Sequence, residues 1–408
     1  MKHRILVAVA CLLLAALILL LLPSPNPTPT PGITTPTTSI LPTIPTTPTT
    51  TEPIPLGVVR LYSCDASLRE ALTGLAQVYT QQTGLEVIVL GPETEDCQAT
   101  LQGLMAGEDA PSVFCVHSGD QLAAWEDILL DLNSTYLAPM LRSESLKLGI
   151  GSKWLAIPMG MKAHGLLMNA ELMAGVALTR SDITDFASLG TAVQILKNNS
   201  VKAFPTLTPT PEDAWYLLSA KDADRTREFL DMYLTSYNKT GDGLTQFLDG
   251  KAAFLPGGSW DYDRLASYEG RTFHVRNLDI LPTYLGDAMQ YLCDWAWCVN
   301  STVSREDLSA TMAFLTWLVT ADEVVGSPME QLQVLTPFAS CHYYGNQLEK
   351  KLLTYMASEP AVIVFDEASP ENELLPEFLT TYLASPTDEN WEQLWLCIEL
   401  IGTPPLTE

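Results

Sequence analysis

The residues best suited to binding chemistry stand together at Gly257-Gly258-Ser259-Trp260-Asp261. The glycine pair predicts a sharp turn and a close approach of the backbone to another group. Beside it, Trp260 offers a flat apolar surface and Asp261 offers a carboxylate. An indole and a carboxylate at the end of a strand can hold a small polar molecule with flat apolar faces, such as a sugar. The alternative is a buried tryptophan after a tight turn.

The elements that would position this pair can be predicted from the residues before it. Gly250 fits the position just after a helix, where a positive φ is needed. Ala252–Leu255 is a short apolar run with turn signals on both sides, so it predicts a buried strand. Trp295 and Trp297 lie two apart on another predicted strand and therefore share a face. We expect at least one of these two indoles to contact the ligand, with core packing as the alternative, and Trp215 is a further candidate.

Strands alternate with helices in the first part of the folded region. The predicted strands are 58–62, 85–90 and 112–116, and the helices between them are marked by apolar residues at i, i+3 and i+4 spacing. This alternation predicts a parallel, doubly wound α/β sheet. Further helices are predicted at 306–319 and near 346–357. No internal repeats are present.

In such a sheet, ligands lie beyond the carboxyl ends of the strands. This rule selects Ser63 and Asp65 after the first strand, and His117, Ser118 and Gln121 after the third. Hydroxyl, carboxylate, imidazole and amide groups can all hydrogen-bond the hydroxyl groups of a sugar. Helix capping is the competing interpretation of the same residues.

Composition limits the function classes. The chain has 408 residues, which is long for one ordinary domain. Its 48 acidic and 22 basic residues give a net charge of −26, which disfavours nucleic-acid binding because phosphate groups would be repelled. A hydrophobic content of 47% indicates a substantial core rather than disorder.

The first 55 residues read as a membrane anchor followed by a stalk. Residues 5–22 are uninterruptedly apolar, follow Lys2, His3 and Arg4, and are just long enough to span a bilayer. An uncleaved anchor (1–22) is our first interpretation and a cleaved signal peptide the second; both place the body outside the cytoplasm. Residues 23–55 are rich in Pro and Thr, which predicts an extended, disordered stalk.

Seven cysteines follow the predicted anchor, at irregular spacings. Their odd number argues against a disulfide framework, although one or two bridges remain open outside the cell. Cys293 and Cys298 are five apart, so on a strand they point to opposite faces and should not pair.

Motifs of catalysis are missing from the sequence. It contains no Gly-x-Ser-x-Gly, no His-Glu-x-x-His and no phosphate-binding loop ending in Gly-Lys-Ser/Thr. No cysteine pair has zinc-finger spacing, and the five histidines are scattered. We therefore predict no catalytic residues, no metal site and no cofactor. Turnover of a glycoside would revive an enzyme interpretation.

Four segments, in this order, resemble the extracellular solute-binding proteins of bacterial ABC importers, in particular the carbohydrate-binding family that includes maltose-binding protein. They are LREALTGLAQVYTQQTGLEVIV; ATLQGLMAGEDAPSVFCV; WLAIPMGMKAHGLLMNAELM; and FLDGKAAFLPGGSWD followed by LDILPTYLG and WAWCVN. Together they span most of residues 56–320. The last 70 residues match poorly. Members in single-membrane bacteria usually carry a lipid-modified cysteine directly after the signal, whereas Cys11 here lies inside the apolar run.

The resemblance implies a two-lobed periplasmic-binding-protein-like fold of type II, with crossing strands between the lobes near 158–162 and 290–297. One lobe would be 56–160 plus 293–335, and the other 161–292 plus 336–408. Closure of the lobes would enclose the ligand. Met159 falls near the first crossing, where it would either line the cleft or fill the core.

The same resemblance implies a function. We expect a monomeric, membrane-tethered solute-binding protein on the extracellular face of a bacterial membrane, which captures a mono- or oligosaccharide and delivers it to an ABC permease. One alternative is a non-sugar solute such as a peptide or a polyamine. Another is a receptor module of the same fold that senses ligand or presents a surface, which the long stalk favours.

Overall fold

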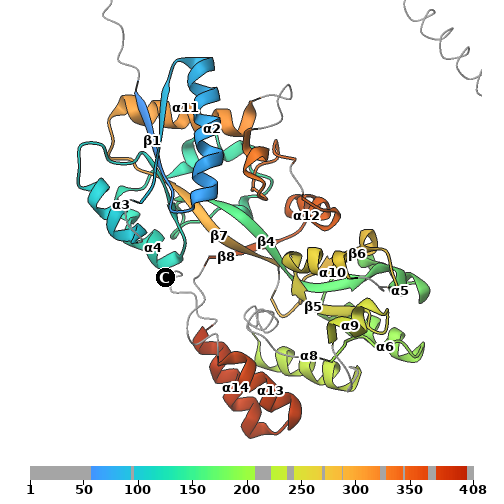
Figure 1. Cartoon of the computed structure of the whole chain (residues 1–408). Helices are drawn as coiled ribbons and strands as arrows, with labels where there is room; N and C mark the ends of the chain where they lie inside the picture. Colours follow the sequence, from blue (N-terminus) through green and yellow to red (C-terminus); the bar gives the residue numbers. More distant parts are fainter. Residues whose placement is uncertain are drawn as a thin grey trace, which may run out of the picture. The chain divides into compact units, whose positions relative to one another are not determined.

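The computed structural model (Figure 1) describes residues 57–92, 96–206, 222–236, 243–268, 272–286, 288–321, 328–342, 345–365 and 374–401. All of them belong to one unit, residues 55–408. The predicted anchor (1–22), the predicted stalk (23–55) and Trp215 lie outside the described residues. Among the helices that the structure describes, none is long and apolar enough to cross a membrane.

The N-terminal part forms the predicted alternation of strands and helices. Its elements are β1 (Val58–Tyr62), α2 (Ala66–Thr83), β2 (Glu86–Leu90), α3 (Cys97–Met105) and β3 (Val113–Val116). β1 pairs in parallel with both β2 and β3. Helix α2 ends at Gly84, whose φ of +76° is readily adopted only by glycine.

The remaining strands join the same sheet but run mostly antiparallel. They are β4 (Ala156–Asn169), β5 (Phe254–Gly258), β6 (Leu278–Leu281), β7 (Met289–Val299) and β8 (Ala361–Val364). The strand order is β2-β1-β3-β7-β4-β5, with β6 on β4 and β8 on β7. The parallel pairing predicted for the first three strands is confirmed, whereas β7 is antiparallel to both β3 and β4 and parallel to β8. β7 lies between β3 and β4, and these two strands run in the same direction because each is antiparallel to β7.

Helices and short 3-10 turns make up the rest of the fold, and α2 and α11 (Arg305–Thr320) lie beside β1 (Figure 1). After α4 (Gly119–Ala124) come η1 (Glu126–Ile128), η2 (Leu132–Ser134), η3 (Ala138–Met140), η4 (Glu144–Leu146), α5 (Ala170–Gly175), η5 (Arg180–Asp182), α6 (Phe186–Asn198), α8 (Ala223–Ser236) and α9 (Gly243–Leu248). The later elements are η7 (Ser259–Asp261), α10 (Tyr262–Ser267), η8 (Val275–Asn277), α11 (Arg305–Thr320), η9 (Pro328–Leu332), α12 (Gln347–Ser358), α13 (Leu375–Ala384) and α14 (Asp388–Ile401).

The buried apolar side chains divide into separate clusters, and the division falls within β4. Ile157 and Met159 pack into a cluster with residues of β1, α2 and α11. Met161 and Ala163, one step further along the strand, pack into a cluster with residues of β6 and α12. The fold is therefore a mixed α/β fold in which two long central strands connect distinct cores.

The strand predicted at Ala252–Leu255 is present but displaced. β5 begins at Phe254 and continues through the glycine pair, and Gly258 has an extended backbone (φ −144°, ψ −179°). The predicted sharp turn at this pair is wrong, because both glycines pair with β4. The turn comes one residue later, in η7. Gly250, by contrast, has the expected positive φ, +69°.

Candidate ligand-binding site

Strands β4 and β7 carry the candidate site (Figure 1). They pair from Ala156 opposite Cys298 to His164 opposite Gln290. Gly160 lies in the middle of this ladder with a φ of +62°. A Cβ atom there would lie 3.2 Å from Nε1 of Trp295. Both the backbone conformation and the crowding explain why glycine stands at this point of β4.

Replacing Gly160 by alanine tests whether this position requires glycine. We expect Gly160→Ala to lower the free energy of unfolding by about 1–2 kcal/mol, because an alanine at a positive φ is strained. Urea unfolding at neutral pH measures the change. Gly74→Ala is the control: Gly74 lies within α2, and a Cβ there would meet nothing within 4 Å. That variant should gain up to about 1 kcal/mol, and an equal loss in both variants would contradict the strain.

One face of the β4–β7 pair carries polar side chains. Gln290, Leu292 and Asp294 alternate along β7, and His164 and Lys162 are the cross-strand partners of Gln290 and Leu292. Nζ of Lys162 lies 2.7 Å from Oδ2 of Asp294, and both side chains are nearly half exposed (45% and 46%). The Asp294 carbonyl oxygen lies 3.3 Å from Nδ1 of His117.

His164 is the buried end of this face. Its Nδ1 lies 3.1 Å from Oε1 of Gln290, and within the described residues its Nε2 has no hydrogen-bond partner. Its ring is parallel to the indole of Trp260, with centroids 5.8 Å apart and planes inclined by 8°. Burial lowers the pKa of His164 to about 4, so the imidazole is neutral at pH 7.

This burial predicts a pH-dependent stability. Between the ordinary pKa of 6.5 and about 4, the unfolded chain binds a proton that folded His164 does not. Proton binding therefore stabilises the unfolded state as the pH falls through that window. The free energy of unfolding should be about 3 kcal/mol lower at pH 4. The measurement is urea unfolding at pH 7 and pH 4 for the wild type and His164→Gln. The variant should lose about 3 kcal/mol less than the wild type, whereas equal losses would contradict the prediction.

Trp260 is placed by the turn that follows β5. The Gly258 N–H donates to Oδ2 of Asp261 (3.1 Å), and Arg264 donates to Oδ1 of the same carboxylate (2.6 Å). A Cβ on Gly257 would lie 2.5 Å from Oδ2 of Asp261, and one on Gly258 would lie 2.2 Å from the Trp260 ring. The glycines thus allow the expected close approach. Asp261 is buried and its oxygens are engaged by the chain, while Trp260 remains partly exposed.

Two of the residues predicted at the ends of β1 and β3, Asp65 and Ser118, act as helix caps. Asp65 accepts hydrogen bonds from the N–H groups of Ser67 and Leu68 at the start of α2, and the Ser67 hydroxyl, which also donates to it, lowers the pKa of Asp65. Ser118 accepts from the Gln121 N–H at the start of α4, and Oε1 of Gln121 accepts from the His117 N–H.

Ser63 is buried beside them. The capping alternative is therefore realised at Asp65 and Ser118. Of the residues predicted at these two strand ends, His117 contacts β7, through the Asp294 carbonyl oxygen.

Three predicted residues lie in or beside the core. Met159 and Trp297 are completely buried, in the cluster that also includes residues of α11. Trp295 is partly buried, and its ring lies 5.4 Å from that of Trp297. Because Met159 and Trp297 pack among the apolar side chains of this cluster, we leave them out of the site proposed below.

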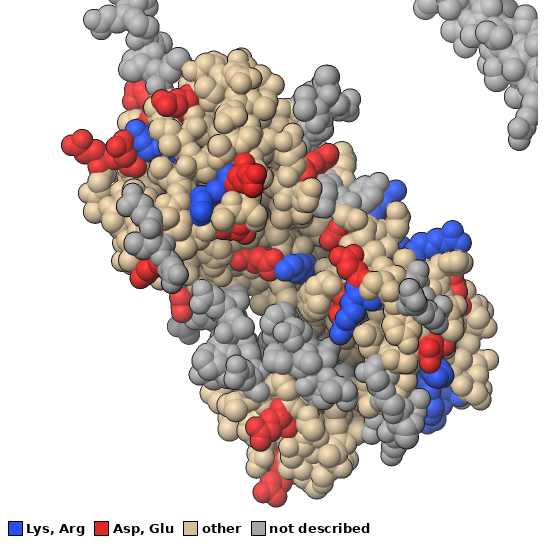
Figure 2. Space-filling model, in the orientation of Figure 1, with Lys and Arg blue, Asp and Glu red and all other residues tan. Residues whose placement is uncertain are grey.

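We define the polar row as Trp260, His164, Gln290, Lys162, Asp294 and His117. Gln290 and Asp294 are four residues apart, so the row extends about 13 Å along β7. Figure 2 shows acidic side chains distributed over the visible face, several beside a basic one, rather than gathered in one patch. The sequence analysis selected Trp260 and His117 but missed the other four. A signal was available, since Lys162 and Asp294 are the single charged residues of two mostly apolar strands.

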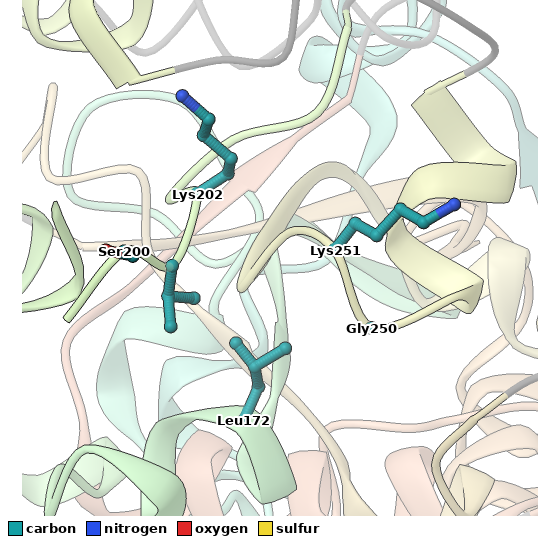
Figure 3. A pocket seen from close by; sticks show the side chains of 6 residues that line it. Leu172, Ser200, Lys202, Gly250 and Lys251 are labelled. Atoms are coloured by element: carbon teal, nitrogen blue, oxygen red, sulfur yellow. The ribbon is translucent and has the colours of Figure 1, made fainter.

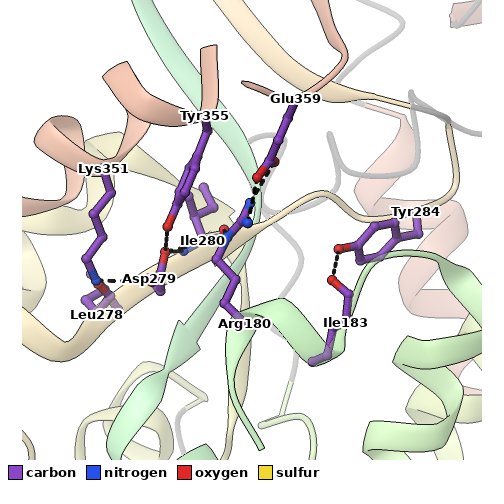
Figure 4. A network of polar contacts seen from close by, with 9 residues as sticks. All are labelled: Arg180, Ile183, Leu278, Asp279, Ile280, Tyr284, Lys351, Tyr355 and Glu359. Atoms are coloured by element: carbon purple, nitrogen blue, oxygen red, sulfur yellow. Dashed lines mark hydrogen bonds and ion pairs between the residues drawn. The ribbon is translucent and has the colours of Figure 1, made fainter. Parts of the chain in front are cut away.

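Two other features lie apart from the polar row. A hollow of about 510 Å³ is lined by Leu172, Ser200, Val201, Lys202, Gly250 and Lys251 (Figure 3), none of which the sequence analysis had placed in a site. A polar network joins η5, β6 and the end of α12 (Figure 4). Among the described residues, no group of His, Cys, Asp and Glu side chains could hold a metal ion.

Solved structures share the fold at low sequence identity. An extracellular solute-binding protein, family 1, from Alicyclobacillus acidocaldarius matches with a TM-score of 0.64 and 12% identity, over 86% of this chain and all of that one. The bacterial solute receptor AcbH, described as preferring β-D-galactopyranose, matches with a TM-score of 0.62 and 12% identity, over 86% of this chain and all of that one. A cyclic α-maltosyl-1,6-maltose binding protein from Arthrobacter globiformis matches with a TM-score of 0.56 and 15% identity, over 85% of this chain and 99% of that one.

These structures define the fold class as that of the periplasmic-binding-protein-like solute binders, as predicted. The family model for bacterial extracellular solute-binding proteins matches residues 74–341. The chain therefore belongs to the bacterial extracellular solute-binding proteins. The family is one of binding proteins, which agrees with the prediction that the chain is not an enzyme, and its members act outside the cytoplasm. No curated protein sequence is similar to the chain.

Proposed function

We propose that this solute-binding protein captures a carbohydrate on the polar row and delivers it to an ABC permease. The observation that carries the proposal is the partly exposed indole of Trp260, held parallel to His164 at one end of a row of polar side chains. An aromatic ring stacks on the C–H faces of a sugar, and the polar groups can hydrogen-bond its hydroxyls. The sugar ligands named for AcbH and for the Arthrobacter protein support this choice.

Two lobes that close on the ligand would follow from the division of the core. The clusters change between Met159 and Met161 on β4, on either side of Gly160. On β7, Tyr291 belongs to the cluster of Met161 and Trp297 to that of Met159. We propose the boundaries expected from the sequence: 56–160 plus 293–335 for one lobe, and 161–292 plus 336–408 for the other. Near the edges of these segments, Phe338 and Cys341 pack in the cluster of Met159, and Leu146 and Leu335 pack in that of Met161. The Lys162–Asp294 ion pair would lie at the hinge.

The location at the membrane is also a proposal. The apolar run 5–22 after three basic residues supports an N-terminal anchor, and the Pro/Thr-rich segment 23–55 supports a stalk. Together they would hold the binding unit near a permease in the same membrane. We also propose that the protein is a monomer, as expected from the sequence.

A thermal-shift screen tests the choice of ligand. Residues 55–408, which form one unit, are heated with a panel of mono- and oligosaccharides and, separately, with spermidine and short peptides. A ligand that binds only the folded state raises Tm. We expect at least one sugar to raise Tm and the amines and peptides to leave it unchanged. A shift with spermidine or peptides alone would refute the carbohydrate assignment while leaving the family unaffected.

A further inference from the structure

Two cysteines from different elements meet beside β1. Cys64 follows β1, and Cys97 is the first residue of α3. The Tyr62 hydroxyl donates to the carbonyl oxygen of Cys97 (2.7 Å), and Sγ of Cys64 donates to the same hydroxyl (3.8 Å). Sγ of Cys64 and the carbonyl oxygen of Cys97 thus both contact one hydroxyl group, that of Tyr62. Both cysteines are partly exposed, so an oxidant can reach them.

We propose that Cys64 and Cys97 form a disulfide in the exported protein. The family acts outside the cytoplasm, where disulfides form and persist. In the structure all seven described cysteines are free thiols. The inference rests on the family and not on the identity of the ligand.

Cys115 and Cys298 do not offer an equivalent pair. Cys115 and Cys298 lie on neighbouring strands, but Cys115 is opposite Trp297, and Cys298 is opposite Phe114. Side chains that are one position out of register point to opposite faces of the sheet, so these thiols cannot meet. Both are buried as well.

The chemistry requires an oxidant, which would be a disulfide-bearing molecule or protein outside the membrane. One thiolate attacks the oxidant's S–S bond and forms a mixed disulfide. The second thiolate then displaces the remaining thiol. In total, two cysteine thiols lose two protons and two electrons, the Cys64–Cys97 bond forms, and one S–S bond of the oxidant becomes two thiols. Burial raises the pKa of Cys64 to about 12, so we expect catalysed rather than spontaneous oxidation.

The bond would close the loop from residue 64 to residue 97, which includes α2 and β2. It would also tie the segment of Ser63 and Asp65, at the carboxyl end of β1, to the start of α3. Closing a loop of this length restricts the unfolded chain. We expect loss of the bond to lower Tm by roughly 5–10 °C.

Peptide mapping tests the proposal directly. The full chain is isolated from cells without reductant, alkylated with iodoacetamide while unfolding, and digested under non-reducing conditions. We expect one linked peptide pair containing Cys64 and Cys97, lighter by two hydrogen atoms than the separate peptides, and alkylation of the other cysteines. Alkylation of both Cys64 and Cys97, or a link from either to another cysteine, would overturn the proposal.

Melting curves give an independent readout. Cys64→Ser, Cys97→Ser and the double variant should share one lowered Tm, because each loses the same bond. Dithiothreitol should lower the Tm of the wild type by a similar amount and leave the double variant unchanged. A wild-type Tm that does not respond to dithiothreitol would contradict the bond.

Discussion

Trp260→Ala is expected to weaken sugar binding by roughly 30-fold, a loss of about 2 kcal/mol. The indole supplies a flat face at one end of the polar row, and alanine offers no comparable surface for the C–H groups of a sugar ring. The neighbouring backbone should tolerate the change, because Asp261 keeps its hydrogen bond from the Gly258 N–H. Calorimetric titration with the sugar selected by the thermal-shift screen measures the effect.

The matched control for this variant is Trp395→Ala. Trp395 on α14 is also a partly exposed indole stacked on another ring, with its centroid 5.8 Å from that of Trp391. It belongs to no part of the polar row, so its removal should leave the dissociation constant unchanged. Equal binding by the wild type and Trp260→Ala would show that the sugar site lies elsewhere, although the family assignment would stand.

Arg180→Met is expected to lower the free energy of unfolding by about 3 kcal/mol. Arg180 donates to both oxygens of Glu359 (2.6 and 2.8 Å) and to the Ile280 carbonyl oxygen (2.9 Å), as Figure 4 shows. Its guanidinium also lies 3.7 Å from the ring centroid of Tyr355. Loss of the cation would leave the Glu359 carboxylate without its bidentate partner in a site where both side chains are at least 74% buried (exposures of 19% and 26%).

The rest of the network explains why Arg180 matters for the fold. Asp279 on β6 accepts hydrogen bonds from the Tyr355 hydroxyl (2.7 Å) and from Lys351 (3.2 Å), both on α12. Arg180 and Asp279 thus fix the middle and the C-terminal end of α12 to β6 and η5. The positive charge of Arg180 therefore contributes to docking this helix, which packs in the cluster of Met161.

Urea unfolding measures this loss, with Arg227→Met as the control. Arg227 pairs with Asp388 at 2.5 Å, but their side chains are 37% and 82% exposed, so that variant should change stability by less than about 1 kcal/mol. The double variant Arg180→Met, Glu359→Gln should lose less free energy of unfolding than the sum of the losses in the two single variants, because both substitutions remove the same interaction. Full additivity would contradict the pairing.

Much of the fold was accessible from the sequence because local patterns determine it. Apolar spacing predicted helices at 306–319 and 346–357, close to α11 and α12. The runs before Ser63 and Cys115 predicted β1 and β3, and Gly84 was correctly expected to end α2. Each of these features depends on residues that are near in sequence, so periodicity and glycine placement suffice.

The direction of β7 could not be predicted in this way. The sequence of an apolar strand has the same pattern whether its neighbours run parallel or antiparallel. The insertion of β7 between β3 and β4 depends on contacts between residues more than a hundred positions apart. For the same reason Trp297 and Met159 could not be assigned to the core. Their faces are set by the pairing of β7 with β4.

The candidate site was only partly predictable. Trp260 could be selected from its glycine-rich context, but its partner His164 lies on β4, almost a hundred residues earlier. Lys162 and Asp294 become a pair only through the antiparallel register of β4 and β7. A charge within an apolar strand shows that a polar face exists, and the fold alone shows which charges share it.

A crystal structure of residues 55–408 with the tightest-binding sugar tests the central claim most directly. We expect a sugar ring stacked on Trp260, with hydroxyl groups hydrogen-bonded to side chains of the polar row. A sugar bound away from Trp260, for instance in the hollow beside Lys202 and Lys251, would contradict it.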